Sequence, residues 1–289
     1  MSTRLVWERD GRDWPNHAAS RFVQAAGLHW HIQQAGTGPV ILLVHGTGAA
    51  THSWRDVFPL LSNDYTVIAP DLPGHGFTDT PSPAGLSLPG MADSLARLLT
   101  AIGLAPSIVV GHSAGAAILV RVCLNGAIEP RAVMSINGAL LPLGGLSGQI
   151  FSPLAKLLFA NPLIPRLFAW RAGDSAVVQR LIDGTGSKLD PVGIKLYGRL
   201  VQNSAHAAAA LGMMANWDLQ PLQREISRLK SPLTLVVGQN DRTVPPSESQ
   251  RVRALLPSAQ LVTLPGLGHL AHEERPKEIA TLIRNLMLT

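Results

Sequence analysis

Residues 108–116 read IVVGHSAGA, and this stretch decides the fold. An apolar run ends at Gly111, and a second run of helical character, Ala116 to Leu124, follows Gly115. The pattern predicts a buried strand that turns sharply into a helix, with glycine on both sides of Ser113 because the backbone of such a turn is crowded. Ser113 would then project above the edge of a sheet and act as a nucleophile. The alternative is a glycine-rich turn whose serine only caps the helix.

A serine hydroxyl becomes a useful nucleophile only beside a base, so one of the ten histidines must lie next to Ser113. His269 ends the stretch GLGH (266–269), just beyond the last expected strand, where a loop can place an imidazole over the turn. His272 is the near competitor, but it starts the terminal helix, where we expect it to cap that helix or to face solvent. His269 is therefore the predicted base.

The orienting acid should follow the strand before that histidine. Asp241 closes the stretch GQND (238–241) in this position. The order Ser113, Asp241, His269 is the nucleophile, acid, base order that accompanies this strand-turn-helix motif. The other position for an acid, after the strand that ends near Ile136, holds Asn137, which carries no charge.

Attack by Ser113 on an acyl carbon would create an oxyanion, which needs backbone N–H donors. The stretch HGTG (45–48) directly follows the expected strand Val40–Val44 and offers the N–H of Thr47. The N–H of Ala114, the residue after the nucleophile, supplies the second donor. A phosphate-binding loop is excluded because the Gly-Lys-Ser/Thr ending is missing.

Short apolar runs recur along the chain with helical segments between them, which is typical of parallel strands covered on both faces. Near the start, two strands form a hairpin around Ala26 and Gly27. We therefore predict an α/β fold with a mostly parallel, eight-stranded sheet flanked by helices. The expected strands are residues 20–25, 28–34, 40–45, 66–70, 107–111, 132–136, 233–237 and 260–264, and the expected helices are 54–61, 88–102, 114–124, 248–256 and 276–288.

Residues 139–217 interrupt this alternation, because they hold helical pieces cut by prolines and no convincing strand. We expect a helical cap here, inserted into a core made of residues 1–138 and 218–289. Trp170 and Trp217 lie in or beside the cap and are candidates for stacking on a flat substrate. The alternatives are helices that simply pack on the core, or an apolar face that rests on a membrane.

Charge and composition narrow the class of partner. The net charge is +5, and seven cations against three aspartates in residues 139–217 account for +4 of it. Elsewhere positive residues are scattered, so we expect no nucleic acid as partner. The apolar, basic cap suits an anionic amphiphile or an anionic membrane surface. The single cysteine and the absence of an apolar leader in residues 1–13 favour a cytoplasmic protein.

Taken together, these motifs resemble the α/β-hydrolases. The resemblance spans the chain and rests on residues 45–48, 71–78, 111–115, 241 and 268–276. It implies the α/β-hydrolase fold and a serine hydrolase, with residues 71–78 as scaffolding around the pocket. Because the nucleophile position holds Ser113 and not aspartate, the carboxylate chemistry of dehalogenases and epoxide hydrolases is not expected.

A narrower similarity extends into the cap. Residues 7–16, 19–23, 45–54, 168–171, 213–218 and 264–276 look like the magnesium-chelatase accessory proteins (BchO type) of bacteriochlorophyll gene clusters. That resemblance implies a role around magnesium insertion into protoporphyrin, with a porphyrin, the chelatase subunits and the photosynthetic membrane as candidate partners.

Two functions therefore remain open. The first is a serine hydrolase that cleaves an ester, thioester or related acyl bond of a hydrophobic substrate. The second is a non-catalytic porphyrin-binding accessory factor that uses the same site as a pocket. A third idea is that His29 and His31, which alternate on a strand, bind a metal, but exposed strand histidines are commoner, so we expect neither a metal site nor a cofactor.

Overall fold

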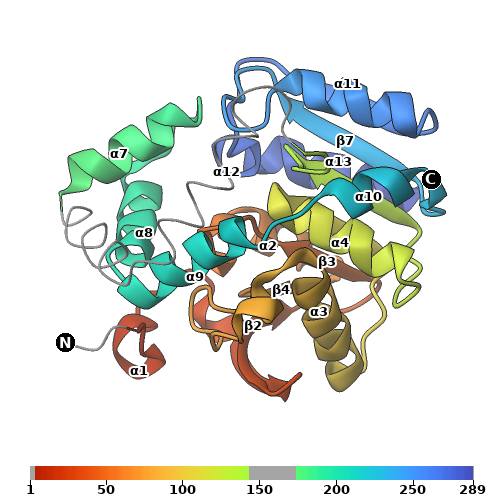
Figure 1. Ribbon diagram of the computed structural model, residues 1–289. Coiled ribbons are helices and arrows are strands. Elements are labelled where there is room, and N and C mark those ends of the chain that lie inside the picture. Colours follow the sequence, from red (N-terminus) through yellow and green to blue (C-terminus); the bar gives the residue numbers. More distant parts are fainter. Residues whose placement is uncertain (1–3, 143–173, 289) are drawn as a thin grey trace.

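The protein is described here by a computed structural model, in which residues 4–142 and 174–288 are placed well enough to be described (Figure 1). Its centre is one sheet of eight strands, as the alternation of apolar runs predicts. The strands are β1 (Ser20–Ala25), β2 (Leu28–Ala35), β3 (Val40–Val44), β4 (Thr66–Pro70), β5 (Ile108–His112), β6 (Ala132–Ile136), β7 (Leu233–Gly238) and β8 (Gln260–Leu264).

The strand order is β1-β2-β4-β3-β5-β6-β7-β8. Only β2 runs against its neighbours, pairing antiparallel with β1 and with β4. All later pairs are parallel, and β5 lies between β3 and β6. The carboxyl ends of the parallel strands therefore meet at one edge of the sheet, where Ser113 directly follows β5.

Helices cover both faces of the sheet, and this explains why the central strands are apolar throughout. On one face, α3 (Leu88–Ile102) and α4 (Ala114–Leu124) pack in one buried cluster with side chains of β3 and β5. On the other face, α2 (Val57–Leu61) and α13 (Pro276–Leu288) pack in a second cluster. The remaining helices outside the insertion are α1 (Trp7–Asp10), α10 (Gln220–Glu225), α11 (Pro246–Leu255) and α12 (Ala271–Glu274).

The expected helix at residues 54–61 is divided in the structure. A 3₁₀ turn, Thr51–Trp54, comes first, and α2 begins only at Val57. The expected hairpin and the other four expected helices are present, with bounds that differ by at most two residues.

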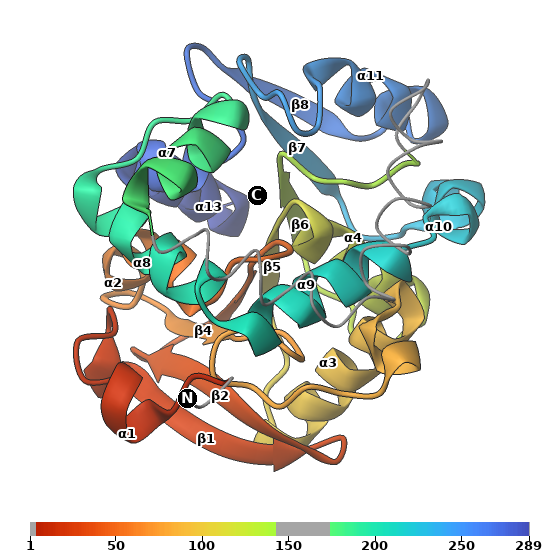
Figure 2. The same ribbon diagram turned by 60° about the vertical axis from the view of Figure 1, so that its left-hand side comes forward.

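Between β6 and the segment that leads to β7, the described residues 174–217 hold three helices: α7 (Ser175–Gly184), α8 (Pro191–Val201) and α9 (Ser204–Ala215). Side chains cap all three, since Asp174, Asp190 and Asn203 accept hydrogen bonds from backbone N–H groups in the first turns. Figures 1 and 2 show the three helices grouped on one side of the molecule. Ala49, in the loop after β3, packs with side chains of α7 and α8, so the group lies over the carboxyl edge of the sheet. Among the described helices, none combines the length and the apolar character needed to cross a membrane.

The β1–β2 hairpin turns at Ala26 and Gly27, which both have positive φ, 52° and 73°. Two central residues with positive φ define the type I′ turn, which suits the twist of a hairpin but strains any residue with a Cβ. Asparagine tolerates this conformation better than alanine.

We therefore expect Ala26→Asn to raise the free energy of unfolding by about 0.5–1 kcal/mol. Urea unfolding of the two proteins measures the difference. The same change at exposed Ala84, which lacks a positive φ, is the control and should bring no gain. Equal effects at the two positions would contradict the argument from strain.

Candidate active site

Ser113 occupies a backbone conformation that few residues adopt, with φ 52° and ψ −119°. The turn is tight enough to require its two glycines. A Cβ on Gly111 would lie 2.4 Å from the amide nitrogen of Ala116, and one on Gly115 would lie 2.3 Å from the carbonyl oxygen of Val44. The strand-turn-helix geometry predicted from the sequence is thus present, and the side chain of Ser113 caps no helix.

His269 and Asp241 form a buried pair. Nδ1 of His269 donates to Oδ2 of Asp241 over 2.8 Å, and the other carboxylate oxygen accepts from the N–H groups of Thr243 (2.7 Å) and Val244 (2.9 Å). The carboxylate is thus fixed by three donors. In the described part of the chain no hydrogen bond joins Ser113 to His269, a contact that often tightens only when substrate binds.

Two further side chains hold the backbone of His269, and sequence reasoning did not find them. His112 donates from Nε2 to the carbonyl oxygen of His269 (2.9 Å), and Asn137 donates from Nδ2 to the same oxygen (2.7 Å). The Asn137 side chain also donates to Gly268 and accepts from the N–H of Gly238. Asn137 therefore ties the loop of the base to the strand that carries the acid.

The loop after β3 lies against the serine. A Cβ on Gly46 would be 2.9 Å from Nδ1 of His112 and 3.0 Å from Cβ of Ser113, so a larger residue here would displace these side chains. Neither Thr47 nor Ala114 donates its backbone N–H to any group in residues 4–142 or 174–288. The Thr47 hydroxyl instead contacts the sulfur of Met213, on α9, at 3.4 Å.

His206, on α9, links the insertion to two loops of the core. Its Nδ1 accepts from the N–H of Gly76 (3.1 Å), and its Nε2 donates to the carbonyl oxygen of Gly48 (3.1 Å). Both ring nitrogens are used and the ring is buried, so burial lowers its pKa to about 4. The neutral imidazole thereby fixes the loop that carries Thr47.

The α7–α8 connection contacts the loops that carry Asp241 and His269. The carbonyl oxygen of Thr185 accepts from the N–H of Arg242 (3.1 Å) and of His269 (3.4 Å). The Ser187 hydroxyl accepts from the N–H of Leu270 at 2.7 Å. The insertion therefore contacts the oxyanion loop through α9 and the acid–base loops through this connection.

Residues 71–78 act as scaffolding. Asp71 is fully buried and accepts hydrogen bonds from the N–H of Thr51 (2.7 Å), the N–H of Phe77 (3.0 Å) and Nδ1 of His31 (2.7 Å). These interactions hold the pKa of Asp71 well below its usual value although burial opposes the charge. The expectation that His31 is exposed was wrong, because the ring pairs with this carboxylate inside the protein.

The expectation for His272 was also wrong. The ring neither caps a helix nor faces solvent, but is completely buried on α12 between His112 and Trp54. Burial lowers its pKa to about 3. The cause is the short α12, which turns this face of the chain inward before α13 begins.

Of the two candidate substrate-binding tryptophans, only Trp217 lies among the described residues. Trp217 follows α9 and is partly buried against the cluster beneath α3 and α4. Trp170 lies outside the described residues. Within residues 4–142 and 174–288, no three His, Cys, Asp or Glu side chains are grouped to hold a metal ion.

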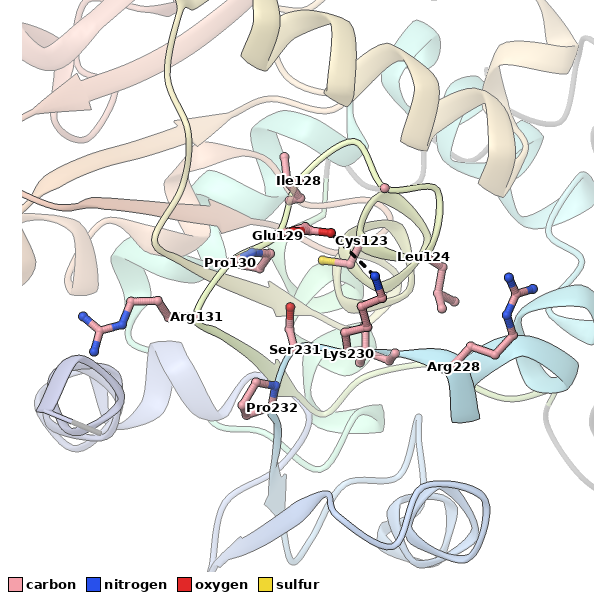
Figure 3. A pocket seen from close by; sticks show the side chains of 12 residues that line it. Cys123, Leu124, Ile128, Glu129, Pro130, Arg131, Arg228, Lys230, Ser231 and Pro232 are labelled. Atoms are coloured by element: carbon pink, nitrogen blue, oxygen red, sulfur yellow. Dashed lines mark ion pairs between the residues drawn. The ribbon is translucent and has the colours of Figure 1, made fainter.

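A cavity of about 500 Å³ lies at the opposite edge of the sheet (Figure 3). It is formed by the segments that lead into β6 and β7, whereas Ser113 follows the carboxyl end of β5. Arg131, Arg228 and Lys230 line it, and Lys230 is 3.9 Å from Glu129. It contains none of the candidate catalytic groups.

Comparison with known proteins agrees with this geometry. The model of the alpha/beta hydrolase family matches residues 41–282. The chain belongs to the alpha/beta hydrolase family. The fold predicted from the sequence is therefore confirmed.

Similarities to individual proteins of known name or structure refine this assignment. The chain is 37% identical over 263 residues to the magnesium-chelatase 30 kDa subunit of Rhodobacter capsulatus, covering 90% of this chain and 92% of that one. It is 27% identical over 271 residues to a pyrrolizixenacetamide deacetylase of Xenorhabdus hominickii, covering 88% and 92%. An alpha/beta hydrolase fold protein of Burkholderia ambifaria superposes with a TM-score of 0.78 at 23% identity, covering 92% and 97%. The narrower resemblance to the chelatase accessory proteins is thus confirmed as well.

The buried histidines of this alpha/beta hydrolase make its stability depend on pH. Burial lowers the pKa of His206 to about 4 and that of His272 to about 3. In the unfolded chain both would titrate near 6.5. Below about pH 6.5, these histidines are therefore protonated in the unfolded state while they stay neutral in the native state. The free energy of unfolding decreases as the pH falls, until the pH reaches the pKa of the folded state.

We expect each of these histidines to contribute a slope of up to about 1.4 kcal/mol per pH unit between pH 6 and pH 4. His206→Gln keeps one acceptor and one donor but cannot titrate, so the slope should become shallower by about that amount. Urea unfolding at several pH values measures it. His17→Gln, at an exposed ring, is the control, and an unchanged slope in His206→Gln would contradict the assignment.

Proposed function

We propose that the protein is a serine hydrolase that cleaves an ester, thioester or related acyl bond of a hydrophobic or amphiphilic substrate. The observation that carries the proposal is the hydrogen bond from His269 to the buried Asp241, together with the contact that holds the His269 backbone to His112, the residue before Ser113 in the strained turn. Strained backbone of this kind costs about 1–3 kcal/mol and persists where the surroundings enforce it.

In the proposed reaction, the hydroxyl oxygen of Ser113 attacks the acyl carbon while Nε2 of His269 takes its proton. Asp241 keeps the proton on Nδ1 and stabilises the imidazolium that forms. The N–H groups of Thr47 and Ala114 stabilise the oxyanion. His269 then protonates the leaving group, and a water molecule, activated by the same imidazole, releases the acid and restores Ser113.

We infer further that residues 139–217 form a cap over this site and select the substrate, with Trp170 and Trp217 as candidates for stacking. In the described part of the insertion, Leu181 and Val192 are exposed, as are the cations Arg180, Lys188 and Lys195. Because residues 139–217 carry a net charge of +4, apolar side chains in this segment favour an anionic amphiphile, such as a porphyrin that bears carboxylates, or an anionic membrane surface. The similarity to a magnesium-chelatase subunit supports a cytoplasmic role beside that step, with the chelatase subunits as candidate partners.

A fluorophosphonate probe tests the nucleophile, because it reacts with an activated serine. We expect the probe to label the wild type and not Ser113→Ala. Asp241→Asn should retain the fold but lose up to about 10⁴-fold in labelling rate, because the amide favours the wrong tautomer of His269. Ser135→Ala, another buried serine, is the control. Absence of labelling in a well-folded wild type would contradict the proposal.

A second candidate function is that of a non-catalytic porphyrin-binding accessory factor, in which the same site serves as a pocket. The similarity to a chelatase subunit is the observation that favours it.

Complementation of a null strain separates the two functions. If hydrolysis is required, Ser113→Ala should fail to restore pigment synthesis although the variant accumulates at the wild-type level. Tetrapyrrole intermediates are the readout, and immunoblotting controls for expression. Full restoration by Ser113→Ala would favour the binding function instead.

A further inference from the structure

Six buried polar side chains form a continuous group behind the loop of the candidate base. We call this group the buried polar cluster; its members are His52, Trp54, Arg55, His112, His272 and Glu273. Eight of their nitrogen and oxygen atoms are buried and find no hydrogen-bond partner among the described residues. A buried polar atom without a partner is costly, so such atoms rarely gather in one place unless something satisfies them.

The members lie next to one another. The rings of His112 and His272 are 4.4 Å apart between centroids, and those of His272 and Trp54 are 4.5 Å apart. Nε2 of His272 is 4.0 Å from Oε1 of Glu273, and Nη1 of Arg55 is 3.8 Å from Oε2 of Glu273. Gaps of this size are too long for a direct hydrogen bond, and a water molecule that contacts both atoms of a pair can satisfy them.

The far end of the cluster reaches the insertion. Tyr197, on α8, donates its hydroxyl to Oε1 of Glu273 over 2.7 Å, and its ring packs on His52 at 4.6 Å between centroids. Burial raises the pKa of Glu273 to about 8, so a neutral carboxyl group is accessible there near neutral pH. The cluster thus connects α8 to the base of the candidate active site.

The unpartnered atoms include both hydrogen-bond donors and acceptors. Trp54 and Arg55 each offer a donor, and the neutral rings of His52 and His272 each offer one donor and one acceptor. His112 donates from Nε2 to the His269 carbonyl oxygen, so its Nδ1 must be an acceptor. Oε2 of Glu273 accepts when the group is ionised, and the neutral carboxyl group that its raised pKa allows can donate instead. Water donates two hydrogen bonds and accepts two, so it suits a mixed set of this kind.

We propose that the buried polar cluster is a binding site for resident water molecules, which position His269 by holding His112 in the tautomer that donates to its carbonyl oxygen. A water that donates to Nδ1 of His112 keeps the proton on Nε2. At the end of the cluster nearest α8, Tyr197 and Glu273 hold these water molecules, so they are positioning residues. The water site stands on its own, whereas the effect on catalysis rests on the proposed hydrolase function.

Trp54→Phe tests the water site without any substrate. The matched control is Trp30→Phe, because the Trp30 indole donates to the carbonyl oxygen of Ala25 over 3.0 Å. If water accepts from Trp54, both variants lose a satisfied hydrogen bond, and we expect Tm to fall by about 2–4 °C in each. If Tm falls in Trp30→Phe but stays or rises in Trp54→Phe, the indole has no partner and the water site is overturned.

A crystal structure of the wild type provides the second measurement should Trp54→Phe not fold. Ordered water within about 3.2 Å of the His272 ring nitrogens and of Oε2 of Glu273 is the expected result. Side chains that pair directly with one another, or a dry cluster, would overturn the proposal.

Glu273→Leu and Glu273→Gln test the positioning role. The proton on Nδ1 of His269, identified by its loss in His269→Gln, is followed by NMR, which needs no turnover. We expect its resonance to move in Glu273→Leu and to stay near the wild-type position in Glu273→Gln, whose amide can still bind Tyr197 and water. An unmoved resonance in a folded Glu273→Leu overturns the positioning role.

Probe labelling then separates this inference from the proposed function. If the wild type is labelled, Glu273→Leu should react about tenfold more slowly, within the 100-fold that misplacement of a catalytic group can cost. A wild-type rate in this variant counts against positioning. If the wild type is not labelled but the NMR shift is seen, the hydrolase function fails and the water site with its hold on His269 stands.

Discussion

The site depends on one steric constraint, the close approach of the β5–α4 turn to the loop after β3. With φ 52° at Ser113, the chain can reverse only if Gly111 and Gly115 admit neighbouring backbone within a distance that no Cβ allows. In the loop after β3, Gly46 likewise approaches the side chain of Ser113 closely. The position of Ser113 and its strained backbone follow from this packing.

Around this turn, neutral histidines hold the loops, in addition to the Arg55–Asp190 and Arg199–Asp13 salt bridges that join the insertion to the core. His206 bonds two loops at once, His112 holds the loop of the base, and burial keeps the pKa of both below the usual value. A neutral imidazole offers one donor and one acceptor, so it can satisfy two backbone groups without bringing a charge into the interior. These contacts therefore fix the loops without adding a charge beside the ring of His269, where a cation would oppose its protonation.

The sequence was sufficient for the sheet, because each buried parallel strand is an apolar run bounded by turn residues. It was also sufficient to place Ser113 in its strand-turn-helix and to pair Asp241 with His269, because these residues stand where strands end and chain order restricts the choice; their catalytic roles stay a prediction. It was not sufficient for His206, Asn137 or the buried position of His272. Their partners lie about 100 or more residues away in the chain, so no local pattern marks them. His31 was misjudged for the same reason, since Asp71 is 40 residues distant.

The insertion contacts both halves of the candidate site, and this bears on the two functions considered for it. Met213 and His206 reach the oxyanion loop, while Thr185 reaches the backbone of His269. A ligand that moves α9 relative to the α7–α8 connection must therefore change the distance between the oxyanion donors and the base, because packed interiors do not absorb such shifts locally. Under the proposed function, ligand binding at the insertion and reaction at Ser113 would therefore be coupled, because the same helices contact the loops of Thr47 and of His269.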